Sequence, residues 1–374
     1  MSGRVLRVRE LARKELTQLL RDVRTRMLIF VAPIIQLLLF GYAVRTDVPN
    51  TALWVVDHDR SVESRALIDA FTTTGYFENV GSSDRSSDLA DALDAGRAVV
   101  GLEIPVGFAR TLERREAAGV QLLVDGSQSN TATVALGYAV RIVSAFGRAR
   151  APAGIAVGTL DLRTRAWFNP TLESRIYNVP GVIALLILLM CLTLTALAIV
   201  REREFGTLDQ LMVTPLRPGE FLLGKTVPVA VIALVDLAVI SLVAIAWFDI
   251  PFRGSAFVLL PAGILFIVTG IALGLLISSV SRTQQEAFMT MFLVLLPSII
   301  LSGFFYPVGS MPLLFQWVTE LNPVRHFLVV VRVVFLKGEG IATLWPHVGA
   351  LTVIAAATMG AALWRLGRIG AGAR

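Results

Sequence analysis

The segment PGVIALLILLMCLTLTALAIV, residues Pro180–Val200, contains 21 consecutive residues without a charged side chain. A helix of about 20 apolar residues is long enough to cross the hydrocarbon core of a bilayer. The composition of the whole chain agrees, because 55% of its 374 residues are hydrophobic and only 17% are charged. Soluble domains usually carry about 25% charged residues. The chain is therefore expected to be an integral membrane protein, and a soluble enzyme or a disordered chain is excluded.

Five further segments have the same character, so the sequence predicts six membrane spans. These five are Met27–Val44, Phe221–Phe248, Phe257–Val280, Ala287–Tyr306 and Ile341–Trp364. Charged residues interrupt only Phe221–Phe248, at Lys225 and Asp236. The uncharged run after Ala287 is too long for one crossing, and the Gly and Pro residues of Ser302–Pro312 are expected to break it. A segment of about residues 307–338 is therefore predicted to lie at the interface or to re-enter the bilayer.

Lysine and arginine residues in the short connections predict the orientation. The N-terminal 26 residues, Arg201–Lys225, Ser281–Glu286 and the tail after Trp364 together hold 16 of them, against four on the opposite side. Such residues favour the cytoplasmic side, so both termini are expected there. The long segment Arg45–Tyr177 is then extracytoplasmic. The first span is interpreted as an uncleaved signal anchor, because its 18 residues exceed the apolar core of a signal peptide.

Residues 1–26 are predicted to form an amphipathic connecting helix before the first span, residues 27–44. Its apolar residues recur at steps of three and four, with basic residues such as Arg7 and Lys14 on or near the other side. The apolar stripe consists of Val5, Val8, Ala12, Leu16, Leu19 and Val23. A basic amphipathic helix beside a span favours a position on the anionic inner leaflet. The alternative is a helix packed on a partner protein.

Residues 45–177 have a different, mixed polar composition, and they predict a small extracytoplasmic α/β domain. Short β-branched runs at Thr51–Asp59, Ala98–Ile104 and Val120–Ser127 alternate with helical patterns. The helical patterns are Val62–Phe71, Ser87–Ala95, Phe108–Ala117 and Ala132–Arg150. The adjacent residues Asp57, His58 and Asp59 make a weak metal or catalytic site, because neighbouring strand residues point to opposite faces. We interpret them as a strand end entering a turn. No metal-ligand spacing is present.

The stretch Gly219–Thr226, GEFLLGKT, matches the phosphate-loop pattern G-x-x-x-x-G-K-[ST] letter by letter. The context argues against that function, because PLRP precedes the stretch where a buried strand is needed. The residues between the glycines favour a helix, and an apolar helix continues for more than 20 residues afterwards. Lys225 is interpreted instead as a cation that extends from the inner end of the third span towards water. The chain is therefore expected to bind no nucleotide.

The loop REREFGTLDQLMVTPLRPGEFLLGK, residues Arg201–Lys225, carries a short amphipathic helical pattern. Phe205, Leu208 and Met212 recur at steps of three and four, Leu211 lies beside Leu208, and Pro215 ends the pattern. Each such side chain contributes roughly 1.5–3 kcal/mol when it is buried in a partner's groove. The loop can therefore act as a rigid element that a partner protein binds and displaces. The alternative is an ordinary interfacial loop.

Several separated motifs resemble the permeases of ABC type-2 exporters, particularly bacterial drug and lipid efflux permeases with a large outer domain. The motifs are WFNPTLESRIYNVPGVIALLILL (Trp167–Leu189), REREFGTLDQLMVTPLRP (Arg201–Pro218), LWVVDHDRSVESRALIDAF (Leu53–Phe71), IPVGFARTL (Ile104–Leu112) with LLVDGSQSN (Leu122–Asn130), and LNPVRHFLVVVRVVFLKGEG (Leu321–Gly340). The resemblance implies six spans, residues 178–374 carrying the last five, in a bacterial inner membrane. It also implies short re-entrant helices before the last span, an N-terminal connecting helix and an α/β outer domain.

The resemblance further implies that a coupling helix, about residues 202–215, engages a separate ATPase subunit. The residues assigned to this contact are Glu202, Arg203, Glu204, Phe205, Gly206, Thr207, Leu208, Leu211, Met212 and Pro215. ATP and magnesium then belong to the ATPase, so no cofactor and no catalysis are expected in this chain. Two permease halves, identical or related, would enclose the pathway for a drug-like or lipid-like substrate. A periplasmic adaptor is left open, and no nucleic-acid partner is expected.

Asp236 lies near the middle of the third predicted span. A carboxylate there costs about 2.5–3.5 kcal/mol on insertion scales, so it is a candidate pathway residue that binds a cation or titrates. The alternative is a protonated side chain bonded across a helix interface. Two other functions stay open at this stage. One is a secondary transporter that uses an ion gradient through Asp236, and the other is a membrane anchor whose outer domain binds a ligand.

Overall fold

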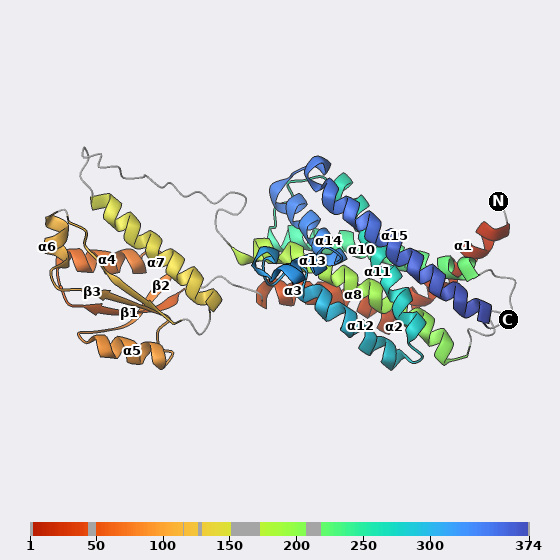
Figure 1. Cartoon of the computed structure of the whole chain (residues 1–374), viewed down its shortest axis with the longest axis horizontal. Helices are drawn as coiled ribbons and strands as arrows, with labels where there is room; N and C mark the ends of the chain where they lie inside the picture. The colour runs from red at the N-terminus through yellow and green to blue at the C-terminus, as the bar shows by residue number, and fades with distance from the viewer. Residues whose placement is uncertain are drawn as a thin grey trace. The chain divides into compact units, whose positions relative to one another are not determined.

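The computed structural model describes residues 3–43, 50–114, 116–125, 129–150, 173–206 and 218–372. Contacts divide the chain into two compact units: Met1–Val44 with Ala166–Arg374, and Arg45–Arg165. The first unit is helical and the second is built on a β-sheet (Figure 1). The strand–helix alternation expected in the second unit is observed.

Four helices of the first unit, within the described residues, are long and apolar enough to cross a membrane. They lie in α8 (Ser174–Glu204), α10 (Pro218–Phe248), α11 (Ala256–Val280) and α15 (Ile341–Gly372). Two shorter apolar helices, Met27–Tyr42 and Gln284–Ile300, overlap the other two predicted spans. The first belongs to the continuous run of α2 (Val23–Arg26), η1 (Met27–Val31) and α3 (Ala32–Ala43), and the second is α12.

The long apolar helix α8 is the centre of the helical unit. In its apolar part 78% of the residues are buried, against 17% in α15, and it contacts α3, α10, α11, α12 and α14. Two glycines let α11 approach it closely, since a Cβ at Gly274 would lie 2.7 Å from Thr195 Cβ and one at Gly270 would lie 2.8 Å from Cys191 Cβ. Small residues at such crossings are typical of helices packed in a bilayer.

The polypeptide after α12 turns at the predicted break, although earlier than expected. Helix α12 (Gln284–Ile300) ends six residues before Tyr306, because Gly303 adopts a positive φ of 83° that few other residues tolerate. Short helices follow before α15. They are η2 (Val308–Ser310), α13 (Leu313–Thr319), α14 (Pro323–Arg332) and η3 (Val333–Lys337).

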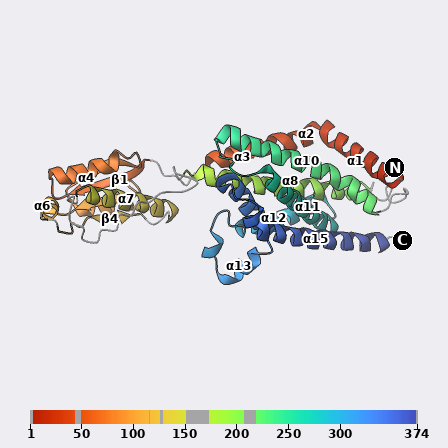
Figure 2. The same cartoon turned by 90° about the horizontal axis from the view of Figure 1, so that it is seen from above.

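The N-terminal helix α1 (Gly3–Arg21) packs lengthwise against α10, and α3 continues along the same helix (Figure 2). The prediction of an apolar stripe on this helix is only partly confirmed. Its middle residues are half-buried, but Val5 and Val23 are exposed. Arg7, expected on or near the polar side, instead faces α10, because Glu220 there supplies a carboxylate partner. Part of this helix therefore packs on its own chain, and Leu6 and Leu20 remain exposed.

The second unit contains a four-stranded sheet in the order β2-β1-β3-β4. Strand β1 (Thr51–Asp57) pairs in parallel with β2 (Phe77–Ser83) and β3 (Val100–Ile104), and β4 (Gln121–Val124) is antiparallel to β3. Helices α4 (Val62–Thr72), α5 (Ser86–Asp94), α6 (Phe108–Glu113) and α7 (Ser129–Arg150) connect or cover the strands. The sequence missed β2, because this edge strand, FENVGSS, buries little beyond Phe77.

One face of this sheet packs on α4 and α7, and the other packs on α5. Val100, Leu102 and Ile104 share a core with Leu67 of α4 and with the buried alanines of α7. Gly101 points the other way, where a Cβ would meet Leu89 of α5 at 2.6 Å. Successive residues of β3 point to opposite faces of the sheet, and helices therefore cover the strand on both faces.

The trio at the end of β1 forms turn contacts. Asp57 accepts hydrogen bonds from the backbone of Asp59 and Arg60, and His58 pairs with Glu103 at 3.2 Å. Asp59 accepts from the backbone N–H groups of Gly107 and Ala109 at the start of α6. The interpretation as a strand end entering a turn is confirmed.

Candidate functional site

The candidate site is the charged end of α8 together with the neighbouring ends of α1 and α10. Four consecutive residues, RERE at 201–204, lie there on the last turn of α8. Consecutive helical residues project about 100° apart, so four of them point around the whole helix. Each of these side chains consequently meets a different neighbour.

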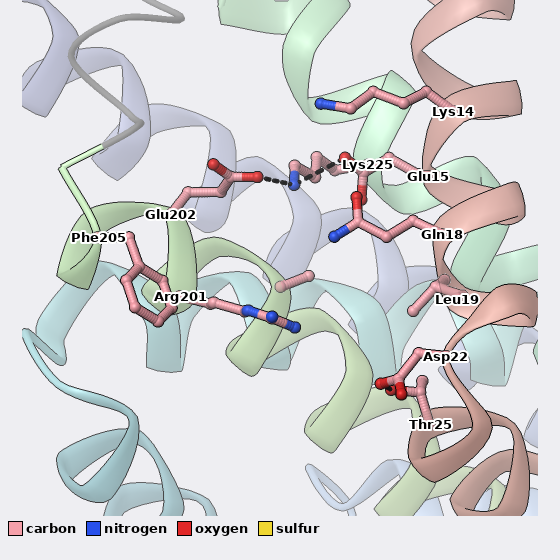
Figure 3. A pocket seen from close by; sticks show the side chains of 11 residues that line it. Lys14, Glu15, Gln18, Leu19, Asp22, Thr25, Arg201, Glu202, Phe205 and Lys225 are labelled. Carbon is pink, nitrogen blue, oxygen red and sulfur yellow. Dashed lines mark hydrogen bonds and ion pairs between the residues drawn. The ribbon is translucent and has the colours of Figure 1, made fainter.

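Glu202 and Glu15 hold Lys225 between them. The Lys225 ammonium lies 2.7 Å from Glu202 Oε1 and 2.9 Å from Glu15 Oε1, and its side chain is 4% exposed (Figure 3). This group of three residues, the Lys225 triad, joins α8, α1 and α10. The expectation that Lys225 extends towards water is wrong, because two carboxylates on neighbouring helices satisfy its charge within the protein.

A second ionic contact and a close approach continue the junction between α1 and α10. The Arg7 guanidinium donates two hydrogen bonds to the Glu220 carboxylate, at 2.8 and 3.1 Å. These hydrogen bonds raise the pKa of Arg7 above its ordinary value. Between the two ionic contacts, a Cβ at Gly224 would lie 2.4 Å from Leu11 Cδ2. Arg7, Leu11 and Glu15, spaced four residues apart, thus form one face of α1 against α10.

Arg203 and Glu204 fasten α8 to two further helices. The Arg203 guanidinium donates to the carbonyl oxygens of Ser278 and Ser281, at 3.0 and 2.7 Å, and so caps the C-terminal end of α11. Glu204 accepts a hydrogen bond of 2.8 Å from the Gln284 side chain at the start of α12. The last turn of α8 therefore holds α1, α10, α11 and α12 together.

The helix α8 ends immediately after these contacts. The N–H groups of Phe205 and Gly206 bond back to the carbonyls of Arg201 and Arg203, and Gly206 has a φ of 71°. This left-handed glycine after the last turn is a common helix stop. Phe205 is 66% exposed. Thr207, Leu208, Leu211, Met212 and Pro215 of the predicted site lie outside the described residues.

A cavity of about 390 Å³ opens between α1 and the end of α8 (Figure 3). Its wall includes the triad, Lys14 and Asp22 from the N-terminal segment, and Arg201 and Phe205 from α8. The Arg201 side chain extends from α8 into this space towards α1. The charges of the wall are mixed, so the cavity selects for no single sign of ligand.

The stretch that matches the phosphate loop is helical throughout, within α10. A phosphate-binding loop wraps its backbone N–H groups around the anion, whereas from Leu222 onwards the N–H groups of this stretch face the preceding helical turn. The motif's lysine is also engaged with two carboxylates. Among the described residues, no group of three or more His, Cys, Asp or Glu is placed to hold a metal.

Asp236, the other predicted site residue, lies away from this junction on α10. Its side chain is in the interior of the helical unit, 1% exposed, and its Oδ2 atom has no hydrogen-bond partner in the described part of the chain. The structure does not join it to the triad. Sequence reasoning missed Glu15 and Glu220, because their partners Lys225 and Arg7 lie on other helices far away in the sequence.

These features are those of a helical membrane protein with several membrane-crossing helices, whose charged helix ends meet at one junction. A β-sheet unit is inserted after its first apolar helix. Residues 24–364 match the model of the ABC-2 family of transporter proteins, and the chain belongs to that family. It is therefore a permease of an ABC transporter, and the family implies an ATPase partner.

Named relatives agree with this family. The chain is 33% identical to the probable multidrug ABC transporter permease YbhR of Escherichia coli, over 94% of this chain and 96% of the relative. It is 32% identical to the probable multidrug ABC transporter permease YbhS of the same organism, over 94% of each chain. It is 29% identical to the inner membrane transport permease YhhJ, also of Escherichia coli, again over 94% of each. The resemblance of the sequence to the permeases of ABC type-2 exporters is confirmed.

Proposed function

We propose that this chain is one half of the membrane pathway of an ATP-driven exporter for drug-like or lipid-like amphiphilic compounds. ATP is bound and hydrolysed by a separate ATPase subunit, and the chain itself catalyses nothing. Residues 202–215 receive the movement of that ATPase, and a second copy or a related permease completes the pathway. The names of the relatives YbhR and YbhS, both called probable multidrug ABC transporter permeases, support the substrate class.

One observation carries the coupling proposal: the last turn of α8, where the predicted coupling segment begins, is bonded directly to α10, α11 and α12, and through Lys225 to α1. A force applied to the segment after Gly206 therefore reaches α1, α10, α11 and α12 through short polar contacts. Removing one member of a buried ion pair costs about 3–5 kcal/mol. A connection of this strength transmits a displacement without slipping.

The proposed topology has six membrane-crossing segments in a bacterial inner membrane. Both termini and the connection between α8 and α10 lie in the cytoplasm, the sheet unit lies outside, and residues 307–338 re-enter from the outer side. The four long apolar helices and the two shorter ones support this number. The shorter α12, at about 1.5 Å per residue, rises roughly 25 Å, close to the thickness of the hydrocarbon core.

The exposed Phe205 provides a direct test of the coupling segment. We expect Phe205→Ala to lower ATP-driven export of a fluorescent amphiphile from proteoliposomes that contain the chain and its co-purified ATPase. Phe257→Ala, at a similarly exposed aromatic far from this junction, is the matched control. Unchanged export and unchanged substrate-stimulated ATP hydrolysis in Phe205→Ala would contradict the proposal. Export driven by a proton or sodium gradient without any ATPase would favour a secondary transporter instead.

A further inference from the structure

Two of the three histidines of the chain lie side by side in the helical unit, although they are on different helices. His326 of α14 and His347 of α15 place their Nδ1 atoms 3.1 Å apart. The third histidine, His58, lies in the sheet unit and pairs with Glu103. The pair plays no part in the coupling junction, so it calls for an explanation of its own.

The hydrogen bonds around His326 show which of its ring nitrogens carries a proton and which can accept a hydrogen bond. Its Nε2 lies 2.8 Å from the carbonyl oxygen of Glu320, and a carbonyl can only accept, so Nε2 carries the proton. In the neutral ring Nδ1 is then an acceptor with a lone pair that points at His347. His347 must donate from its own Nδ1 to fill the 3.1 Å contact.

This arrangement has the features of a metal-binding histidine. Histidines that ligate a metal almost always donate their other ring N–H to a carboxylate, a backbone carbonyl or water, which fixes the tautomer and orients the ring. His326 has such a partner in the Glu320 carbonyl. Two zinc–nitrogen bonds of 2.0–2.1 Å at a tetrahedral angle separate the nitrogens by about 3.3 Å. The observed 3.1 Å is within a few tenths of an ångström of this separation, and the two rings need to turn so that both lone pairs point at the metal.

The surroundings are compatible with a dication. His326 is buried, whereas His347 is half-buried, so the protein leaves one side of the pair uncovered. The nearby cation Arg325 pairs with the Glu320 carboxylate at 2.8 Å, which offsets part of its positive charge. The same Glu320 carboxylate, which is 51% exposed, lies 3.9 Å from His326 Nε2.

We propose that His326 and His347 form a binding site for a transition-metal dication, Zn²⁺ in the first instance, with water completing its coordination. For the metal to bind, the His347 proton moves from Nδ1 to Nε2 through water, so that both Nδ1 lone pairs are free to hold the ion, which then ties α14 to α15. Imidazole ligands suit Zn²⁺, Cu²⁺ and Ni²⁺, whereas Mg²⁺ and Ca²⁺ prefer oxygen. The site is independent of the ATPase partner and of the proposed direction of transport.

Calorimetric titration of the full-length chain in detergent, freed of any polyhistidine tag, with zinc chloride tests the site. We expect one zinc ion per chain and no binding of magnesium. His347→Gln and His326→Gln should each weaken zinc binding at least about tenfold. His326→Gln retains an N–H group for the Glu320 carbonyl, which protects the fold. His58→Gln is the matched control and should bind zinc like the native chain.

The electron paramagnetic resonance spectrum of added Cu²⁺ gives a second readout that counts the nitrogens on the metal. The native chain should show the hyperfine pattern of two nitrogen ligands, and each single variant should show a reduced number. Native-like zinc affinity in both His326→Gln and His347→Gln would overturn the proposal. An equal loss in His58→Gln would also overturn it, because it would indicate unspecific binding to histidines.

Discussion

Replacing Lys225 by methionine tests the junction most simply, because methionine keeps the length of the side chain and removes its charge. Glu15 and Glu202 would then face each other with their shared cation gone. All three side chains are largely buried, the most exposed being that of Glu202 at 19%. Removing one partner from a buried ion pair costs about 3–5 kcal/mol, since it leaves a charge without compensation. The same range is expected here.

Thermal unfolding of the detergent-solubilised chain provides the measurement. At roughly 2 °C per kcal/mol, the midpoint of Lys225→Met should fall by about 6–10 °C. Lys14→Met is the matched control, because Lys14 lines the same cavity, is exposed, and forms no ion pair among the described residues. Its midpoint should stay within about 1 °C of the native value, as for most exposed substitutions.

A compensated variant separates the loss of charge from the loss of packing. In Lys225→Met combined with Glu15→Gln and Glu202→Gln, no uncompensated charge remains, and most of the lost stability should return. A native-like midpoint for Lys225→Met alone would refute the reasoning. So would a triple variant that is no more stable than the single one, because the damage would then be steric.

Three further predictions concern single positions. Gly224→Val should separate α1 from α10, since a Cβ there would lie 2.4 Å from Leu11; protease cleavage after the basic residues of α1 should then accelerate, and unchanged cleavage would argue against this packing. Asp236→Asn should retain full ATP-driven export, because the buried side chain keeps its size; lost export with a normal fold would indicate an ionised role. Burial opposes ionisation of Asp59, but hydrogen bonds from Ser61 and from the N–H groups of Ala109, Gly107 and Phe108 lower its pKa below the ordinary value. Its contribution to the stability of the sheet unit is therefore present above pH about 4 and lost as the pH falls through the lowered pKa, so Asp59→Asn should flatten the acid limb of the unfolding profile.

The apolar helices were predictable because a bilayer demands long uncharged runs, and such runs are visible in one sequence. Pro180–Val200 became the interior of α8 for this reason. The polar edge strand Phe77–Ser83 was not predictable, because its residues lack the alternation of a half-buried strand. The end of α12 was misplaced by six residues, since an uncharged run does not show where the chain turns. Gly303, with its positive φ, sets that turn.

The candidate site was only half visible in the sequence. The charged end of α8 and the rejection of the phosphate-loop match followed from local patterns, but the role of Lys225 did not. Its partners Glu15 and Glu202 come from helices 210 and 23 positions away, and pairing over such distances leaves no mark in a single sequence. The histidine pair was missed for the same reason, because His326 and His347 lie on different helices.

Cross-linking at Phe205 tests the central claim most directly. The only cysteine of the chain, Cys191, is buried, so a cysteine introduced by Phe205→Cys can be labelled selectively with a bifunctional maleimide. In membranes that contain the active exporter, we predict a cross-link to the ATPase subunit whose yield changes when ATP is bound. Active export with no cross-link between this position and any ATPase would contradict the account.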